Sequence, residues 1–367
     1  MSLTAGIVGL PNVGKSTLFN AITKQEILAA NYPFATIDPN VGIVHVPDPR
    51  LAKLTEVFEP DKTIPTTFEF TDIAGLVKGA SKGDGLGNKF LSHIREVDAI
   101  CQVVRCFENN DIIHVEGEID SVRDIGIINT ELMLADIETI EKRLFKIEKK
   151  ALKINDKEGL FEVATLKKIK SNLEQDIPAR SVDYSINEKK LLKSFSLLTL
   201  KPVIYIANIN EDEFNSPDND VVKKIKEIAQ SENASVIKVS AEMEAQLAVF
   251  NDEERVEYLT SMGIKETGLD NLIKTTYDLL GLQTFFTGGP KEVRAWTFKK
   301  GSTAPICAGL IHTDMERGFI KAEVISYEDM IKYGSELKAK EAGKLRIEGK
   351  DYIMQDGDVC HFRFNVT

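Results

Sequence analysis

The sequence predicts an α/β protein built on a phosphate-loop (P-loop) nucleotide-binding domain, with an inserted antiparallel helical coiled-coil arm and a strand-rich C-terminal domain. Three observations predict it. Residues 9–16 match the pattern G-x-x-x-x-G-K-[ST] in full. Apolar residues from 133 to 154 repeat at alternating spacings of four and three. A Gly- and Pro-rich break within 281–290 precedes a run of short strand-like segments.

The phosphate loop lies between a predicted strand and a predicted helix. The apolar run Ala5–Val8 suits a buried strand, and residues 17–22 suit the first turns of a helix. The glycines let backbone N–H groups curl around a phosphate chain, and the helix N-terminus adds its dipole. Lys15 supplies charge to the outer phosphates and assists catalysis, while the Ser16 hydroxyl ligates Mg²⁺. The residues expected to hold the phosphates are Asn12, Val13, Gly14, Lys15, Ser16 and Thr17.

Two further stretches predict switches that respond to the γ-phosphate. The alternating run Thr66–Thr71 is typical of a strand, and it leads into Asp72-Ile73-Ala74-Gly75, a D-x-x-G sequence. We expect Asp72 in the second coordination shell of Mg²⁺ and the Gly75 N–H beside the γ-phosphate. In the loop 31–40, Thr36 is the expected further Mg²⁺ ligand.

Two later strand ends predict the site that reads the base. The apolar run 201–207 ends in Asn208-Ile209-Asn210-Glu211, and the run 234–239 ends in Ser240-Ala241-Glu242. Guanine-nucleotide switches read N-K-x-D and S-A-[KL] at these places. We expect Asn208, Ile209, Glu211 and Ser240 to meet the base. The extra methylene of Glu211 moves its carboxylate, which favours ATP over GTP, although a GTP-preferring enzyme stays open.

At these residues the chain resembles the YchF / Obg-like ATPase family, a branch of the Obg-related translation-factor GTPases. The resemblance covers essentially the whole chain and is specific because its matching strings are long. They are GIVGLPNVGKSTLFN at 6–20, DIAGLVKGASKG at 72–83, VRAWTF at 293–298 and QDGDV at 355–359. It implies a Ras-like P-loop domain, slow hydrolysis of ATP and possible use of GTP, and association with the ribosome or its large subunit.

The group that orients the attacking water is the open point of the mechanism. Leu76 stands where Ras-like switches carry a glutamine, and an aliphatic side chain cannot position water. The glycine-rich loop 78–89 is the expected second switch. The family resemblance points to His114 as the substitute, and His93, on a predicted helix, is the alternative.

The middle of the chain predicts the helical arm. The seam of apolar residues comprises Met133, Ile137, Ile140, Leu144, Ile147, Ala151 and Ile154. A second helical run covers 166–173, before Pro178, and a third covers about 187–198. Residues 128–200 hold 14 Lys and Arg against 12 Asp and Glu, in a chain of net charge −11. The basic side chains on the first helix form either a solvated face or a surface for RNA. They are Lys142, Arg143, Lys146, Lys149, Lys150 and Lys153.

The C-terminal segment predicts a β-grasp fold. Strands are expected at 293–299, 318–324, 352–354 and 359–366, with helical pieces at 327–334 and 336–345. The segment resembles the TGS domain, which implies a binding module that contacts RNA. The expected division is therefore 1–127 with 201–280, the insert 128–200, and the TGS domain 281–367.

Composition limits the remaining possibilities. No run of eighteen apolar residues occurs, the N-terminus lacks a basic signal region, and the four cysteines show no C-x-x-C spacing. We therefore expect a cytoplasmic protein without a membrane partner or a structural zinc. The favoured function is a magnesium-dependent ATP hydrolase that binds ATP, ADP and the ribosome. An adaptor that binds RNA or the ribosome, with nucleotide as a structural ligand, is the alternative.

Overall fold

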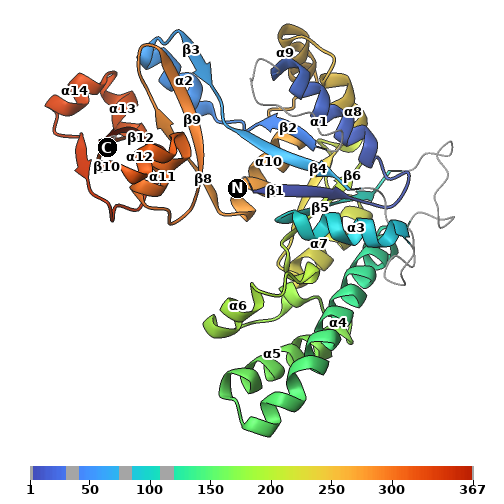
Figure 1. Ribbon diagram of the computed structural model, residues 1–367. Coiled ribbons are helices and arrows are strands. Elements are labelled where there is room, and N and C mark those ends of the chain that lie inside the picture. The colour runs from blue at the N-terminus through green and yellow to red at the C-terminus, as the bar shows by residue number, and fades with distance from the viewer. Residues whose placement is uncertain (1–2, 30–40, 74–84, 108–119, 366–367) are drawn as a thin grey trace. The chain divides into compact units, whose positions relative to one another are not determined.

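The computed structural model describes residues 3–29, 41–73, 85–107 and 120–365 (Figure 1). The chain forms two compact units. Unit one comprises residues 1–44 and 69–272, and unit two comprises residues 45–68 and 273–367. The predicted helical insert belongs to unit one. The predicted three-part division of the chain stays a prediction.

Unit one is built on a six-stranded sheet in the order β2-β4-β1-β5-β6-β7. The five strands from β4 to β7 pair in parallel. Strands β5 and β6, which are neighbours in this sheet, are buried along their whole length, which explains why their sequences are nearly continuous apolar runs. The strands are β1 (Thr4–Val8), β2 (Val41–His45), β4 (Thr67–Asp72), β5 (Ala99–Arg105), β6 (Val203–Asn208) and β7 (Ser235–Val239). The predicted strands of this domain are confirmed to within two residues at each end.

Helices follow the strands of unit one in alternation, as a parallel sheet requires. Those that connect or follow the strands are α1 (Lys15–Ala29), α3 (Gly85–Glu96), α7 (Asp220–Ser231), α8 (Ala241–Leu247), α9 (Asp252–Ser261) and α10 (Gly268–Leu279). The described residues also form the short 3₁₀ turns η2 (Ala179–Ser181), η3 (Leu198–Leu200) and η4 (Glu211–Glu213).

The helical arm of unit one consists of α4 (Ser121–Ile154), α5 (Lys157–Leu173) and α6 (Ile186–Leu192). In Figure 1, α4 runs away from the sheet, and α5 lies beside α4. The ion pairs Glu141–Lys170 and Glu148–Lys167 show that the two helices run antiparallel, because the later residue of α4 pairs with the earlier residue of α5. The predicted seam is confirmed from Met133 to Ala151, and the side chain of its last member, Ile154, lies outside the described residues. Its buried members on α4 are Met133, Ile140, Leu144 and Ala151, and they pack against Val163, Leu166, Ile169 and Leu173 of α5.

The third predicted helix of the arm ends earlier than expected. Helix α6 stops at Leu192, and Ser196 adopts a left-handed φ of 49°. The Ser194 hydroxyl donates to Leu191 O, and such bonds compete with helical ones. The Asp136 carboxylate on α4 then accepts from the backbone N–H groups of Leu198 and Thr199, at 2.8 Å each. These contacts replace the helix predicted to continue to 198.

Unit two contains a second six-stranded sheet, in the order β11-β10-β12-β8-β9-β3. Strand β10 pairs antiparallel with β11 and β12, β8 pairs antiparallel with β9, and the β12–β8 and β9–β3 pairs are parallel. The strands are β3 (Lys62–Ile64), β8 (Leu282–Thr287), β9 (Glu292–Lys299), β10 (Phe319–Ser326), β11 (Arg346–Glu348) and β12 (Asp358–Phe364). The helices are α2 (Pro49–Phe58), α11 (Ala304–Ile311), α12 (Thr313–Arg317), α13 (Tyr327–Tyr333) and α14 (Glu336–Glu341).

Both faces of this second sheet are covered. Successive residues Phe285 and Phe286 of β8 point into different apolar clusters, as the period of a strand requires. Phe285 packs with Cys307 of α11, and Phe286 packs with Leu51 and Leu54 of α2. Residues 45–68 therefore complete the core of unit two.

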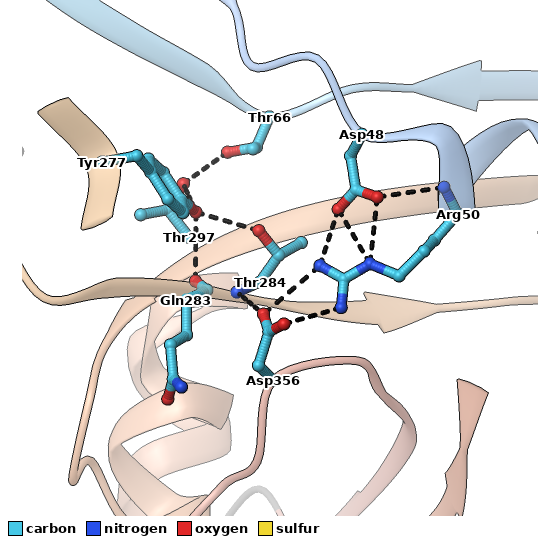
Figure 2. A network of polar contacts seen from close by, with 8 residues as sticks. All are labelled: Asp48, Arg50, Thr66, Tyr277, Gln283, Thr284, Thr297 and Asp356. Atoms are coloured by element: carbon cyan, nitrogen blue, oxygen red, sulfur yellow. Dashed lines mark hydrogen bonds and ion pairs between the residues drawn. The ribbon is translucent and has the colours of Figure 1, made fainter. Parts of the chain in front are cut away.

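A polar network fastens α2 inside unit two (Figure 2). Arg50 donates to Asp48, the N-cap of α2, and to Asp356, with a 2.7 Å bond from Nη1 to Asp356 Oδ2. Asp356 Oδ1 also accepts from the Thr284 N–H of β8 at 2.9 Å. Beside it, the Tyr277 hydroxyl lies 3.0 Å from both Thr284 Oγ1 and Thr297 Oγ1. The network ties residues that lie 72 and 306 positions apart in sequence.

Some sequence expectations for unit two are wrong. Residues 352–354 form no strand, and only an isolated bridge joins Ile353 to Thr303. The predicted Gly- and Pro-rich break lies between β8 and β9, at 288–291, but β8, α11, α12 and β11 are not predicted. Pro305 in α11 lies in the first turn, where its missing N–H costs no helical bond. Within the described residues, no helix is both long and apolar enough to span a bilayer.

Candidate nucleotide-binding site

The phosphate loop leaves β1 after Val8 and ends at Lys15, the first residue of α1. Asn12 and Gly14 have φ values of 64° and 95°, which turn the backbone sharply. Glycine is required at position 14 for two reasons. Its φ is left-handed, and a Cβ there would collide with Asn208 Nδ2. Ser16 and Thr17 are exposed at the start of the helix. The loop therefore presents helix-terminal N–H groups and a hydroxyl, which is the chemistry of an anion site.

Lys15 and Asp72 form an ion pair across this loop. Asp72 ends β4 and lies opposite Ile7 of β1 in the strand register, so the two strand ends meet at one edge of the sheet. The Lys15 side chain is 10 % exposed and that of Asp72 24 %. The structure therefore brings together the predicted phosphate-binding lysine and the predicted Mg²⁺-shell aspartate.

Asn208 braces two loops with its side-chain amide. Its Nδ2 donates to Val13 O in the phosphate loop at 2.9 Å, and its Oδ1 accepts from the Ala241 N–H at 3.0 Å. The side chain is buried, so both bonds are shielded from water. Asn208 thus joins the phosphate loop to the S-A-x loop, a role that the sequence did not assign to it.

The other predicted base-site residues follow the ends of β6 and β7. Ile209 is 3 % exposed, and its N–H donates to Val239 O at 2.9 Å. Glu211 begins η4, and its Oε1 accepts a hydrogen bond from the Tyr258 hydroxyl of α9. Ser240 is the N-cap of α8, where its Oγ accepts from Met243 N at 3.4 Å.

A buried carboxylate supports the floor of this region. Glu244 on α8 is fully buried, and its Oε1 accepts from the Leu269 N–H at the start of α10, at 2.9 Å. Its Oε2 has no hydrogen-bond partner in the part of the chain that the structure describes. Burial raises the pKa of Glu244 to about 7, against the opposing effect of the Leu269 N–H.

Three predicted site residues lie outside the described residues. They are Thr36, Gly75 and His114. The alternative, His93, is half-buried on α3. Sequence reasoning missed Tyr258 and Glu244. No local motif marks either of them, because Tyr258 meets Glu211 across 47 residues of sequence and Glu244 meets the Leu269 N–H across 25.

Comparisons with known proteins agree with this architecture. Residues 4–135 match a family model described as "50S ribosome-binding GTPase", and residues 282–365 match the model YchF-GTPase C, described as "Protein of unknown function". The chain is 60 % identical over 367 residues to a Bacillus subtilis protein named "Ribosome-binding ATPase YchF", and 56 % identical over 366 residues to one of that name from Escherichia coli O157:H7. Each alignment covers 100 % of both chains.

A solved structure matches as fully. The Schizosaccharomyces pombe structure titled "YchF GTPase" superposes with a TM-score of 0.90 at 44 % identity, covering 99 % of this chain and 98 % of that one. The names of these proteins refer to different nucleotides, ATP for the bacterial proteins and GTP for the yeast one.

Proposed function

Because this chain belongs to the YchF family, we propose that it is a ribosome-associated P-loop ATPase, a nucleotide-dependent switch that hydrolyses ATP to ADP and phosphate. GTP is a weaker substrate in this proposal. The observation that best supports this proposal is the phosphate loop, since its left-handed turns, exposed helix N-terminus and lysine suit a phosphate chain. The names of full-length relatives support the ATP and ribosome assignments.

The phosphates are held by Lys15 and by backbone N–H groups over residues 12–17. Lys15 must exchange Asp72 for phosphate oxygens when nucleotide binds, and its charge then also stabilises the transition state. The exchange keeps each charged group paired before and after binding. A nucleotide bound together with its cation therefore suits this site, because its phosphates pair with Lys15 and its cation pairs with Asp72.

The Mg²⁺ that accompanies the nucleotide would be ligated by Ser16 and Thr36, with Asp72 in the second coordination shell. Hydroxyl and carboxylate oxygens are the donors that Mg²⁺ accepts, and Ser16 and Asp72 both border the phosphate loop. When bound, Mg²⁺ neutralises charge that develops on the β- and γ-phosphate oxygens. Gly75 would sense the γ-phosphate through its N–H.

Base recognition is assigned to the loops that Asn208 braces. Ile209, Glu211 and Ser240 border this region, with Asn208 acting mainly by fixing the loops to each other. His114 is the proposed water-orienting group, because Leu76 cannot take that role. Exchange of His114 for alanine should slow turnover and leave nucleotide affinity unchanged.

The helical arm is the proposed contact with the ribosome and with RNA. On α4, Phe145 and Leu152 are 81 % and 64 % exposed, one heptad apart on the same face. Four lysines beside them are exposed, Lys146, Lys149, Lys150 and Lys153. Exposed aromatic and basic side chains together suit a nucleic-acid surface. The TGS assignment of unit two, a second RNA contact there and a cytoplasmic location complete the proposal.

Ribosome co-sedimentation tests the proposal. The full chain is pelleted with ribosomes in the presence of the β,γ-imido analogue of ATP, of ADP, or of no nucleotide. The switch predicts that the pelleted fraction differs between these states. The matched control is Lys15→Ala, in which nucleotide binding and the differences should disappear. Equal pelleting of the parent chain in all three states would favour the adaptor, and no pelleting would contradict the ribosome assignment.

A further inference from the structure

The carboxylate of Glu211 has a partner that the sequence did not anticipate. The Tyr258 hydroxyl donates to Glu211 Oε1, and both residues belong to unit one. Glu211 begins the turn that follows β6, whereas Tyr258 lies on α9, 47 residues later in the chain. The contact therefore acts on the one acidic side chain that stands at the position of the guanine-reading aspartate.

Packing fixes Tyr258 independently of Glu211. The Tyr258 ring meets the Phe250 ring edge to face, with centroids 5.5 Å apart. Both rings pack on a buried cluster formed by Met243, Leu247 and Ile264. Helix α9 begins with a complete capping box, and a second bond, from Asn215 Nδ2 to Met262 O at 2.6 Å, ties the segment after α9 to the segment after η4. The hydroxyl is thus held in place to fix the carboxylate.

The two purine bases make different demands on such a carboxylate. Guanine presents two adjacent N–H donors, which a carboxylate satisfies only with both of its oxygens in one plane. Adenine presents one amino donor beside a ring nitrogen acceptor, and that acceptor repels a carboxylate. A bond that holds one oxygen of Glu211 therefore costs guanine more than adenine.

We propose that Tyr258 is a specificity-determining residue, which holds one oxygen of Glu211 and thereby withdraws the carboxylate from the paired contact that guanine needs. The extra methylene of glutamate, compared with aspartate, lets the carboxylate reach Tyr258. This inference rests on the proposed function, because it explains a preference for adenine nucleotides at the same site.

Isothermal calorimetry on the full chain, with the β,γ-imido analogues of ATP and GTP at matched Mg²⁺, tests it. Tyr258→Phe removes one oxygen atom and keeps the ring that packs on Phe250. The Kd for the GTP analogue should fall by about tenfold, since a hydrogen bond to a charged group is released, while the Kd for the ATP analogue stays within about twofold. Tyr333→Phe, on α13 of unit two, is the matched control and should change neither value.

A second variant tests the same contact from the other side. Glu211→Asp shortens the side chain and separates the carboxylate from Tyr258, so it should also favour the GTP analogue. Adding Tyr258→Phe to Glu211→Asp should then give no further gain, because the bond is already absent. This pair keeps the test decisive if one single variant folds poorly.

Three results would overturn the inference. In the first, neither affinity changes in Tyr258→Phe. In the second, both affinities weaken equally in Tyr258→Phe, which would make Tyr258 only a structural support. In the third, the effects of Tyr258→Phe and Glu211→Asp on affinity for the GTP analogue add in the double variant. A parent chain that binds neither analogue, or that prefers the GTP analogue, contradicts the proposed function itself. A parent chain that prefers ATP with an unaltered ratio in Tyr258→Phe contradicts only the role of Tyr258.

Discussion

Asn208 shows how one side chain can join the two loops of the proposed nucleotide site. Its amide gives one bond to the phosphate loop and takes one from the loop that starts α8. A Cβ at Gly14 would strike the same amide, so the glycine and the asparagine are fitted to each other. The brace couples the phosphate loop with the S-A-x loop, the regions proposed to hold the phosphates and the base.

Replacing Asn208 with alanine should weaken both regions together. Val13 O and the Ala241 N–H would be left buried without a partner, so we expect the free energy of unfolding to fall by about 2 to 4 kcal/mol. Affinity for ATP and GTP should fall alike. Urea unfolding and calorimetry check this, with Asn187→Ala on exposed α6 as the control. A variant as stable as the parent would show that the brace is dispensable.

Glu244 predicts a pH dependence of stability. Its pKa is about 7 in the folded chain, against 4.5 for an ordinary glutamate. Between these pH values the folded chain keeps a proton that the unfolded chain has lost. The stabilisation is therefore fully present below pH 4.5 and is lost as the pH rises through 7. Glu244→Gln removes this titration, so its stability relative to the parent should rise by about 3 kcal/mol between pH 4.5 and 7.

Urea unfolding of parent and Glu244→Gln at several pH values measures that difference. The control is Glu242→Gln, which changes an exposed glutamate on the same helix and should give a difference that does not vary with pH. A pH-independent difference for Glu244→Gln as well would refute the assignment.

At the residue scale, a local pattern marks the predicted phosphate loop, whereas the side-chain contacts of the predicted base-site residues follow no local pattern. The pattern G-x-x-x-x-G-K-[ST] is a local run, so the loop, Lys15 and Ser16 could be assigned from neighbours in sequence. The partner of Glu211 could not, because Tyr258 reaches it only through the packing of α9 on α8. Side-chain contacts between distant segments leave no mark in a local pattern.

At the scale of elements, the helical arm is anchored to the sheet by a buried polar network. Arg180, in the return segment of the arm, donates to Glu232 Oε2 at 2.6 Å. Glu232 also accepts from the Tyr205 hydroxyl of β6 at 2.6 Å and from Asn129 Nδ2 of α4 at 3.1 Å. Because β6 ends at Asn208, the arm and the proposed base region share one buried strand.

Removing the arginine should cost far more than removing an exposed one. Arg180→Met leaves Glu232 buried without its cation, and we expect the free energy of unfolding to fall by about 3 to 5 kcal/mol. Arg143→Met, which breaks the more exposed pair with Glu162 on the arm, should cost less than about 1 kcal/mol. Chemical denaturation compares the two. Equal losses would mean that the network does not anchor the arm.

The elements were predictable where a period is long and unbroken. The seam on α4 runs over three heptads and predicts the arm, and the apolar run 201–207 predicts β6. Short elements were not predicted from the sequence, because α12 and β11 have five and three residues and carry too few positions to show a period. The end of α6 escaped because a side chain, Asp136, takes over the backbone bonds beyond it.

At the scale of the whole molecule, the division into units differs from the linear order of the chain. Residues 45–68 lie in sequence between the loop that carries Thr36 and the strand that carries Asp72, yet they belong to unit two. Sequence could not reveal this, since the amphipathic pattern of α2 indicates one buried face without identifying the sheet that it covers. The hydrogen bond from Arg50 to Asp356 in the polar network joins residues that are 306 positions apart in sequence.

Helix α2 should therefore control the stability of unit two. Leu54→Ala deletes a fully buried side chain from its core and should lower the free energy of local unfolding by about 2 to 5 kcal/mol. Hydrogen exchange should speed up in β8 and β12. Leu337→Ala, at a leucine that is 66 % exposed, is the control and should have little effect. Faster exchange confined to the strands of unit one would contradict this arrangement.

A direct titration of the full chain with ATP and with GTP at matched Mg²⁺ tests the central claim, that this member of the YchF family is an adenine-nucleotide switch. We expect ATP to bind at least about tenfold more tightly than GTP, a difference of about 1.4 kcal/mol. Equal affinities, or tighter binding of GTP, would contradict the account and would mean that Glu211 reads guanine as an aspartate does.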